Sequence, residues 1–110
     1  MIDEKQLSQK LMQFGFSAQY AGYKYILHAM RLVDQDNTYL NTVTTRLYPL
    51  LAETYHVSSA SVEHSIRTAI RSAWSYGDQK AIKSIFGAER PSNARFLAVF
   101  HTYLSTLEGA

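Results

Sequence analysis

The stretch that determines the fold is residues 44–77, TTRLYPLLAETYHVSSASVEHSIRTAIRSAWSYG. It contains two amphipathic segments joined by a short polar turn at residues 56–59. At the α-helical step of about 100° per residue, the second segment has one apolar face and an opposite face of hydroxyls and cations. The apolar set is Val62, Ile66, Ala69, Ile70 and Ala73, and the polar set is His64, Thr68, Arg71 and Ser75, with Ser61 and Arg67 at its margins.

A short helix, a tight turn and a second helix with a polar outer face are typical of a helix-turn-helix. The pattern therefore predicts a helix-turn-helix over residues 44–77, with residues 60–76 as its recognition helix. Most amphipathic helices face only water, so the pattern alone leaves a purely structural role open.

Apolar residues recur at helical spacing on both sides of this stretch, and no segment alternates with period two for long enough to form a strand. A first helix is expected between Asp3, as its N-cap, and Gly15. A second is expected to begin at Ser17, as its N-cap, and to run to about Val33.

Proline and aspartate mark the later boundaries. Pro49 interrupts the third apolar segment, which predicts a kink or a new helix start there. Asp78 caps a short fifth helix that ends at Gly87, and Pro91 opens the last one. The predicted fold class is all-α, a six-helix single domain over residues 1–110.

Composition excludes several classes of function. A chain of 110 residues fits one domain, and the absence of cysteine excludes disulfides, thiolate zinc sites and cysteine nucleophiles. No apolar run approaches the ~20 residues needed to span a bilayer, and no leader peptide is recognisable, so a cytoplasmic protein with no membrane partner is expected. The net charge of +2 is compatible with nucleic acid, with few phosphate contacts.

No pattern points to catalysis, a cofactor or a metal. His28, His56 and His101 are predicted to be surface or packing residues, because no two histidines have the i, i+4 spacing of ligands. Residues 34–38, DQDNT, match the DxDxT nucleophile loop of a phosphatase superfamily. That chemistry needs the end of a parallel strand, so this motif is predicted to be a helix end followed by the cap of the next helix.

Several motifs in the same order resemble one known family. They are GYKYILHAM at residues 22–30, TRLYPLLAETY at 45–55, VEHSIRTAIRSAWSYGD at 62–78, SIFG at 84–87 and PSNARFLA at 91–98. The sequence resembles, over about residues 7–107, the C-terminal DNA-binding effector domain of the stage-zero sporulation response regulator of endospore-forming bacteria. The resemblance implies a six-helix effector domain whose third and fourth helices form the helix-turn-helix. It also implies binding to a short promoter element and regulation of transcription.

Two departures from the family pattern matter. Regulators of this family carry an N-terminal receiver domain, which this sequence lacks, so it is either an excised effector domain or a paralogue without the phosphorylation switch. The family usually has arginines early in the recognition helix, and the matching positions here are Ser61 and His64, whereas Glu63 and Arg67 match. A bidentate arginine–guanine contact contributes about 1–3 kcal/mol of discrimination between bases. Because these arginines are absent, the family's fold can be inferred for this chain more safely than its DNA target sequence.

The predicted partner is double-stranded DNA at a promoter element, with RNA polymerase as a further candidate partner of such a regulator. The protein is expected to be a monomer or weak dimer that pairs on tandem sites in the nucleoid. The competing hypothesis is a protein-interaction module that keeps the fold, has lost DNA binding, and modulates a regulator or RNA polymerase. The candidate DNA-binding residues are Ser58, Ser59, Ser61, Glu63, His64, Arg67, Thr68 and Arg71.

Overall fold

The computed structural model describes residues 2–108, and within them it contains six α-helices and no strand. The prediction of an all-α, six-helix domain is therefore confirmed. A 3-10 helix, Asn37–Asn41, and a π-helical turn, Val43–Leu47, connect the second helix to the third. The α-helices are α1 Glu4–Gln13, α2 Ala21–Gln35, α3 Tyr48–Tyr55, α4 Ser59–Tyr76, α5 Gln79–Phe86 and α6 Asn93–Glu108.

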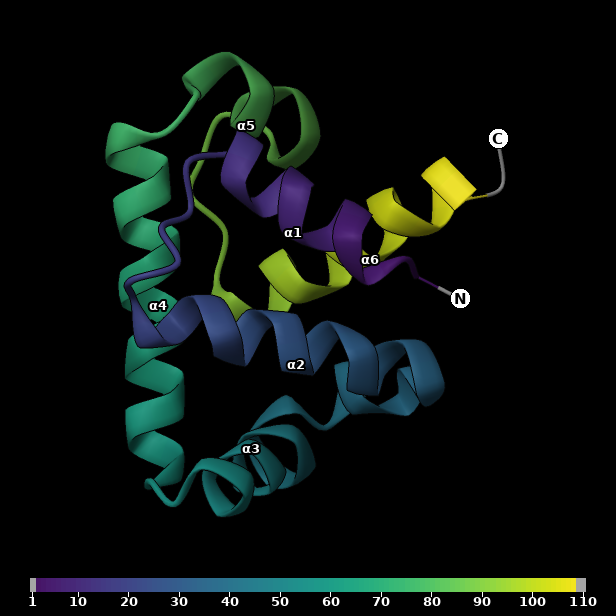
Figure 1. Ribbon diagram of the computed structural model, residues 1–110, viewed down its shortest axis with the longest axis vertical. Helices are drawn as coiled ribbons and strands as arrows, with labels where there is room; N and C mark the ends of the chain where they lie inside the picture. The colour runs from purple at the N-terminus through teal and green to yellow at the C-terminus, as the bar shows by residue number, and fades with distance from the viewer. Residues whose placement is uncertain (1, 109–110) are drawn as a thin grey trace.

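The longest helix, α4, lies along one edge of the molecule, and α2 and α6 run away from it across the centre (Figure 1). α2 packs against α4 more extensively than any other pair of helices does. α3 lies beside the N-terminal end of α4, and α5 follows its C-terminal end. No described helix has the length and the apolar character needed to cross a membrane.

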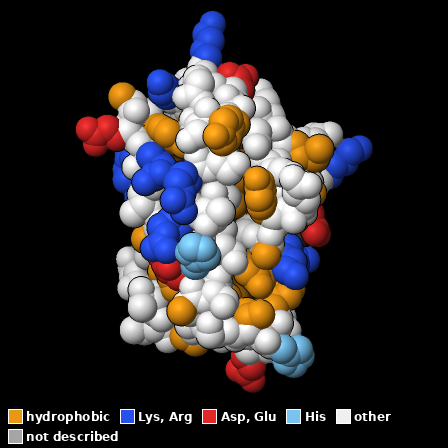
Figure 2. All heavy atoms as spheres, turned by 90° about the vertical axis from the view of Figure 1, so that its left-hand side faces the viewer, with side chains coloured by type: hydrophobic (Ala, Val, Ile, Leu, Met, Phe, Trp, Pro, Cys, Tyr) orange, Lys and Arg blue, Asp and Glu red, His pale blue; other side chains and the backbone are white. Residues whose placement is uncertain are grey.

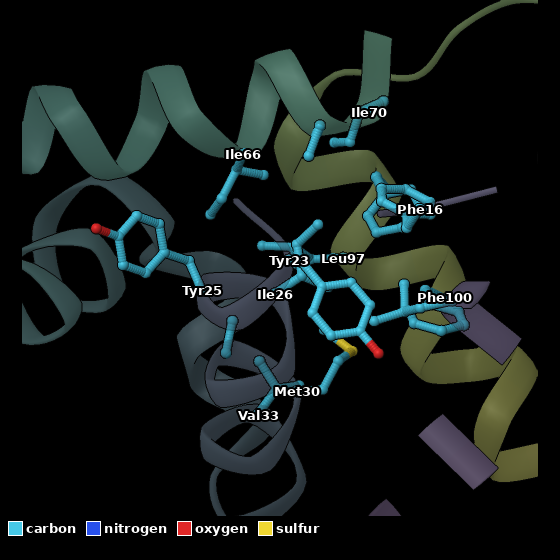
Figure 3. Packing of buried hydrophobic residues seen from close by; sticks show 14 of the residues in the cluster. Phe16, Tyr23, Tyr25, Ile26, Met30, Val33, Ile66, Ile70, Leu97 and Phe100 are labelled. Carbon is cyan, nitrogen blue, oxygen red and sulfur yellow. The ribbon is translucent and has the colours of Figure 1, made fainter. Parts of the chain in front are cut away.

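The apolar face of α4 is the wall of the hydrophobic core. Ile66 and Ile70 project from it into the buried cluster, which also contains Ile26 of α2 and Leu97 of α6 (Figure 3). The predicted apolar set of α4 is buried throughout, at most 3% exposed. Trp74 is only partly buried and packs against the core from its edge.

A glycine allows the close approach of α2 to α4. A Cβ atom added at Gly22 would lie 2.2 Å from the backbone oxygen of Ser65 and 2.8 Å from the Cβ of Ala69. Any larger side chain would therefore have to push the two helices apart. Gly22 determines how tightly α4 is held against the rest of the fold.

The start of α2 corrects one prediction. Ser17 is not its N-cap, because α2 begins four residues later, after Tyr20, and has no side-chain cap. The Ser17 hydroxyl instead accepts a hydrogen bond from the backbone N–H of Gln19, at 3.4 Å. Short polar side chains stabilise local turns as readily as they cap helices. Here the Ser17 hydroxyl stabilises the turn before α2 and does not cap the helix.

The other boundary signals are confirmed. α3 begins at Tyr48 with Pro49 in its first turn, where a missing N–H costs nothing. In the DxDxT segment, Asp36 caps the 3-10 helix by accepting from the N–H of Thr38 at 3.0 Å, and it pairs with Arg46 at 3.2 Å. These hydrogen bonds lower the pKa of Asp36, with the Thr38 side chain as the largest cause. The motif is a helix boundary, as predicted.

Candidate nucleic-acid interface

The connection between α3 and α4 is a tight turn stabilised at both ends. At the end of α3, the N–H of Val57 bonds to the oxygen of Ala52 at 3.0 Å, and the N–H of His56 points to the oxygen of Glu53 at 3.4 Å. This pair of bonds is a Schellman motif, which places its penultimate residue in the left-handed region, and His56 has φ +57°. Ser58 caps α4, because its hydroxyl oxygen accepts from the N–H of Ser61 at 3.0 Å.

The outward face of α4 is polar along its length. His64, Arg67, Arg71 and Ser75 are exposed, and so is Ser61, which agrees with the periodicity of the sequence. Figure 2 shows this edge of the molecule, where Lys and Arg side chains gather in one strip with a histidine at its lower end. The strip is bordered by few acidic groups in this view.

Three of the predicted residues form a connected group at the middle of this face. The Arg67 guanidinium donates to a carboxylate oxygen of Glu63 at 2.9 Å and to Nδ1 of His64 at 3.0 Å. Because an arginine can only donate, Nδ1 of His64 must be the acceptor and its Nε2 carries the proton. The Nε2–H of His64 is therefore available as a hydrogen-bond donor to an outside partner. Together the three residues present a carboxylate, an imidazole and a guanidinium within about one turn of helix.

The serines at the start of α4 divide into two roles. Ser58 uses its hydroxyl twice inside the protein, since the oxygen caps α4 and the proton is donated to the Ser61 hydroxyl at 3.0 Å. Ser61 is exposed, and its own proton is free to be donated outward. Ser59 is half-buried in the first turn. Of the three, Ser61 is the hydroxyl best placed for an outside partner.

Thr68 and Arg71, which the periodicity predicts on the polar face of α4, differ from each other. The hydroxyl oxygen of Thr68 is shielded from solvent and has no hydrogen-bond partner among the described residues. The hydroxyl therefore does not face outward. β-branched side chains in helices are restricted to few rotamers, and the rotamer of Thr68 turns its hydroxyl towards the protein. Arg71 is exposed, as expected.

The structure adds a surface cleft that the sequence did not suggest. It has a volume of about 410 Å³ and lies between α4, the π-helical turn and the start of α6. Asn93 connects the start of α6 to α3 and α4, because its side-chain amide donates to the Tyr48 hydroxyl at 3.1 Å and to the backbone oxygen of Glu63 at 3.0 Å. Arg67 and Arg90 both line this cleft.

Burial raises the pKa of Tyr48 above its ordinary value, the Asn93 hydrogen bond opposes that rise, and the nearby Glu63 carboxylate adds to it. The phenol is therefore neutral at physiological pH. Its oxygen accepts from Asn93, so its proton remains available to an acceptor in the cleft. The sequence predicts only a helix start near Pro91. The hydrogen bond from Asn93 to Tyr48 spans 45 residues, so it has no local signature in the sequence.

The described residues contain no cluster of three or more side chains suited to a metal ion. His28 and Tyr55 contact each other, with 3.1 Å between Nδ1 and the hydroxyl, which agrees with the packing role expected for His28. His56 occupies the turn, and His101 lies 3.6 Å from a carboxylate oxygen of Asp34.

Comparison with known families agrees with this architecture. The family described as "Sporulation initiation factor Spo0A C terminal" matches residues 7–104, which is nearly the whole chain and includes α3, the turn and α4. This is a family of DNA-binding transcription-factor domains and not of enzymes. The protein therefore belongs to the family of the sporulation initiation factor Spo0A C-terminal domain.

Proposed function

We propose that this domain is a sequence-specific DNA-binding regulator of transcription, with α4 as a recognition helix in the major groove. The observation that carries the proposal is the hydrogen-bonded group of a half-buried Glu63 with the exposed His64 and Arg67, which lies just after the tight α3–α4 turn. The major groove is about 12 Å wide and admits one α-helix, whose N-terminal half usually reads the bases.

Each exposed group of α4 has a natural counterpart on DNA. Arg67 can bond to guanine, Glu63 can accept from the cytosine amino group, and the Nε2–H of His64 can donate to an acceptor on a base edge or a phosphate. Ser61 can donate one less selective bond. Arg71 lies about one helical turn beyond Arg67, where a phosphate is the expected partner. Thr68 is left out of the interface, because its hydroxyl is buried.

The competing function is a protein-interaction module on the same fold. Arg67 already has an acidic partner in Glu63, and the net charge of the chain is only +2, both of which favour weak DNA affinity. On that hypothesis the face of α4 would dock on a regulator or on RNA polymerase. Three other features favour DNA binding over this alternative. They are the exposed Arg71, the exposed hydroxyl of Ser61 and the hydrogen-bonding guanidinium of Arg67.

The class can be tested by selection of random duplexes with the purified domain at low salt. Enrichment of a motif supports the proposal, and recovery of unenriched sequences with no measurable binding favours the interaction module.

The placement of α4 is then tested by comparing His64→Ala with Arg71→Ala on selected and scrambled duplexes. His64→Ala should reduce the preference for the selected sequence. Arg71→Ala should weaken all duplexes by a similar factor and lower the salt slope by about 1. His64→Arg should strengthen binding to guanine-containing sites by about 1–3 kcal/mol if the side chain makes the bidentate contact. Two alanine variants that behave identically would contradict the placement.

A further inference from the structure

Resting on the proposed function, we propose that the cleft between α4 and the start of α6 binds one phosphate of the DNA backbone. Arg90 is its principal ligand. This is a contact outside α3 and α4, from a segment that no helix-turn-helix pattern includes. It would fix the position of α4 in the groove, because phosphate contacts set the orientation of a protein on the duplex.

The charges of the cleft favour an anion. Arg67 and Arg90 line it together with one carboxylate, that of Glu63. Glu63 is bonded to Arg67 at 2.9 Å, so these two charges largely compensate each other. Arg90 forms no ion pair with any side chain that the structure describes. The uncompensated charge of the cleft is therefore the positive charge of Arg90.

Neutral donors add to this charge. Tyr48 is only 6% exposed, lines the cleft, and accepts from Asn93, so its own proton is free for an incoming acceptor. Thr44, which is exposed and carries a hydroxyl group, also lines the cleft. Phosphate oxygens accept several hydrogen bonds at once, and arginine and hydroxyl donors are common partners for them.

The cleft is also held in shape before any ligand arrives. Pro91 is buried, and the two bonds of Asn93 attach the start of α6 to α3 and α4. Arg90 directly precedes the buried Pro91 and lies on the short connection between α5 and α6. A cation held beside the recognition helix is well placed for the phosphates that border the groove.

The cleft contact can be isolated by a charge-matched comparison of Arg90→Ala with Lys5→Ala. Lys5 is exposed on α1, and it lies outside the cleft. Binding isotherms are measured over a range of salt on the duplex selected by the wild-type domain and on a scrambled duplex. Thermal unfolding followed by circular dichroism confirms that each variant is folded.

Arg90→Ala should reduce the steepness of the log–log salt slope by about 0.9. The ratio of wild-type to Arg90→Ala affinity should therefore fall about 3.5-fold between about 50 and about 200 mM salt. The loss should be equal on both duplexes, Lys5→Ala should match the wild type, and Arg90→Lys should keep the slope. A scan with single methylphosphonates should find one neutralised phosphate that weakens the wild type and leaves Arg90→Ala unchanged.

The outcomes separate the two proposals. If the wild type binds DNA and Arg90→Ala behaves as Lys5→Ala does, the cleft is not a phosphate site and the proposed function is unaffected. If the wild type binds no duplex, the proposed function itself is wrong, and the cleft proposal fails with it.

Discussion

Arg67 has two partners on its own helix, and they determine what it can offer to DNA. Its guanidinium bonds to Glu63 at 2.9 Å and to His64 at 3.0 Å, although all three side chains lie at the surface. A guanidinium that is already oriented loses less side-chain freedom on binding. The same carboxylate also repels phosphates. On the proposed function, this arrangement is expected to favour discrimination between sequences over general affinity.

Replacing Glu63 with Gln tests this balance. Removing the negative charge should strengthen binding to every duplex at low salt, because one repulsive group leaves the interface. It should also reduce the ratio of affinities for selected and scrambled duplexes, since Arg67 loses its ionic partner. Glu4→Gln is the matched control, because Glu4 of α1 forms an exposed ion pair with Arg31 of α2 and neither residue belongs to α4. An unchanged affinity ratio would show that Glu63 does not contribute to specificity.

His28 gives a prediction about stability and pH. Burial lowers its pKa below the ordinary value of 6.5 for histidine, and the charge of Arg31 lowers it further. The folded state thus binds this proton less readily than the unfolded state does. The contribution of the neutral His28 to stability is fully present above about pH 6.5. It is lost as the pH falls from there through the lower pKa of the folded state.

The difference in unfolding free energy between the wild type and His28→Gln should therefore depend on pH. As the pH falls from about 7.5 to about 5, the wild type should lose more stability than the variant does, as measured by urea denaturation. Parallel curves for the two proteins would contradict the assignment to His28.

At the scale of elements, local signals in the sequence located most helix boundaries. Asp3 and Asp78 cap α1 and α5 as expected, and Pro49 marks the start of α3. These signals succeed because a cap or a proline acts on backbone groups within a few residues. The polar face of α4 was predicted for the same reason, since periodicity along one helix needs no knowledge of its neighbours.

Long-range contacts could not be predicted in this way. The bonds of Asn93 to Tyr48 and to Glu63 span 45 and 30 residues, so no local pattern reports them. The burial of the Thr68 hydroxyl is a tertiary effect as well, because a helical wheel assigns it to the outer face. Arg90 was missed as a candidate ligand because the cleft exists only when α4 and α6 are packed together.

Gly22→Ala tests the contact between α2 and α4. Alanine is favoured over glycine in a helix by about 1 kcal/mol, so local propensity alone predicts a gain in stability. The added Cβ would lie 2.2 Å from a backbone oxygen of α4, which cannot rotate away as a side chain can. We expect a net destabilisation of about 1–3 kcal/mol in denaturant unfolding, because overpacking prevails. Ala21→Ser, at the exposed neighbouring position, is the control, and a stabilised Gly22→Ala would contradict the packing.

At the scale of the whole molecule, the proposed DNA-binding face and the ends of the described chain lie on different sides. Both ends are remote from α4, on the opposite side of the molecule in the view of Figure 1. The outer face of α4 is therefore unobstructed by the chain ends. The two proposals place three cations against DNA, Arg67, Arg71 and Arg90, and their number limits how many phosphates one domain can neutralise.

This limit leads to a prediction about affinity. Three arginines can neutralise about three phosphates, which gives a log–log salt slope of about −3 for a single site. Binding by one domain should then be weak at physiological salt, and a duplex with two sites in tandem should bind more tightly if two domains contact each other. The measurement is a salt titration of duplexes with one or two copies of the selected site, with sedimentation to count the bound domains. Tight binding to a single site with almost no salt dependence would show that the arginines of this face do not supply the affinity.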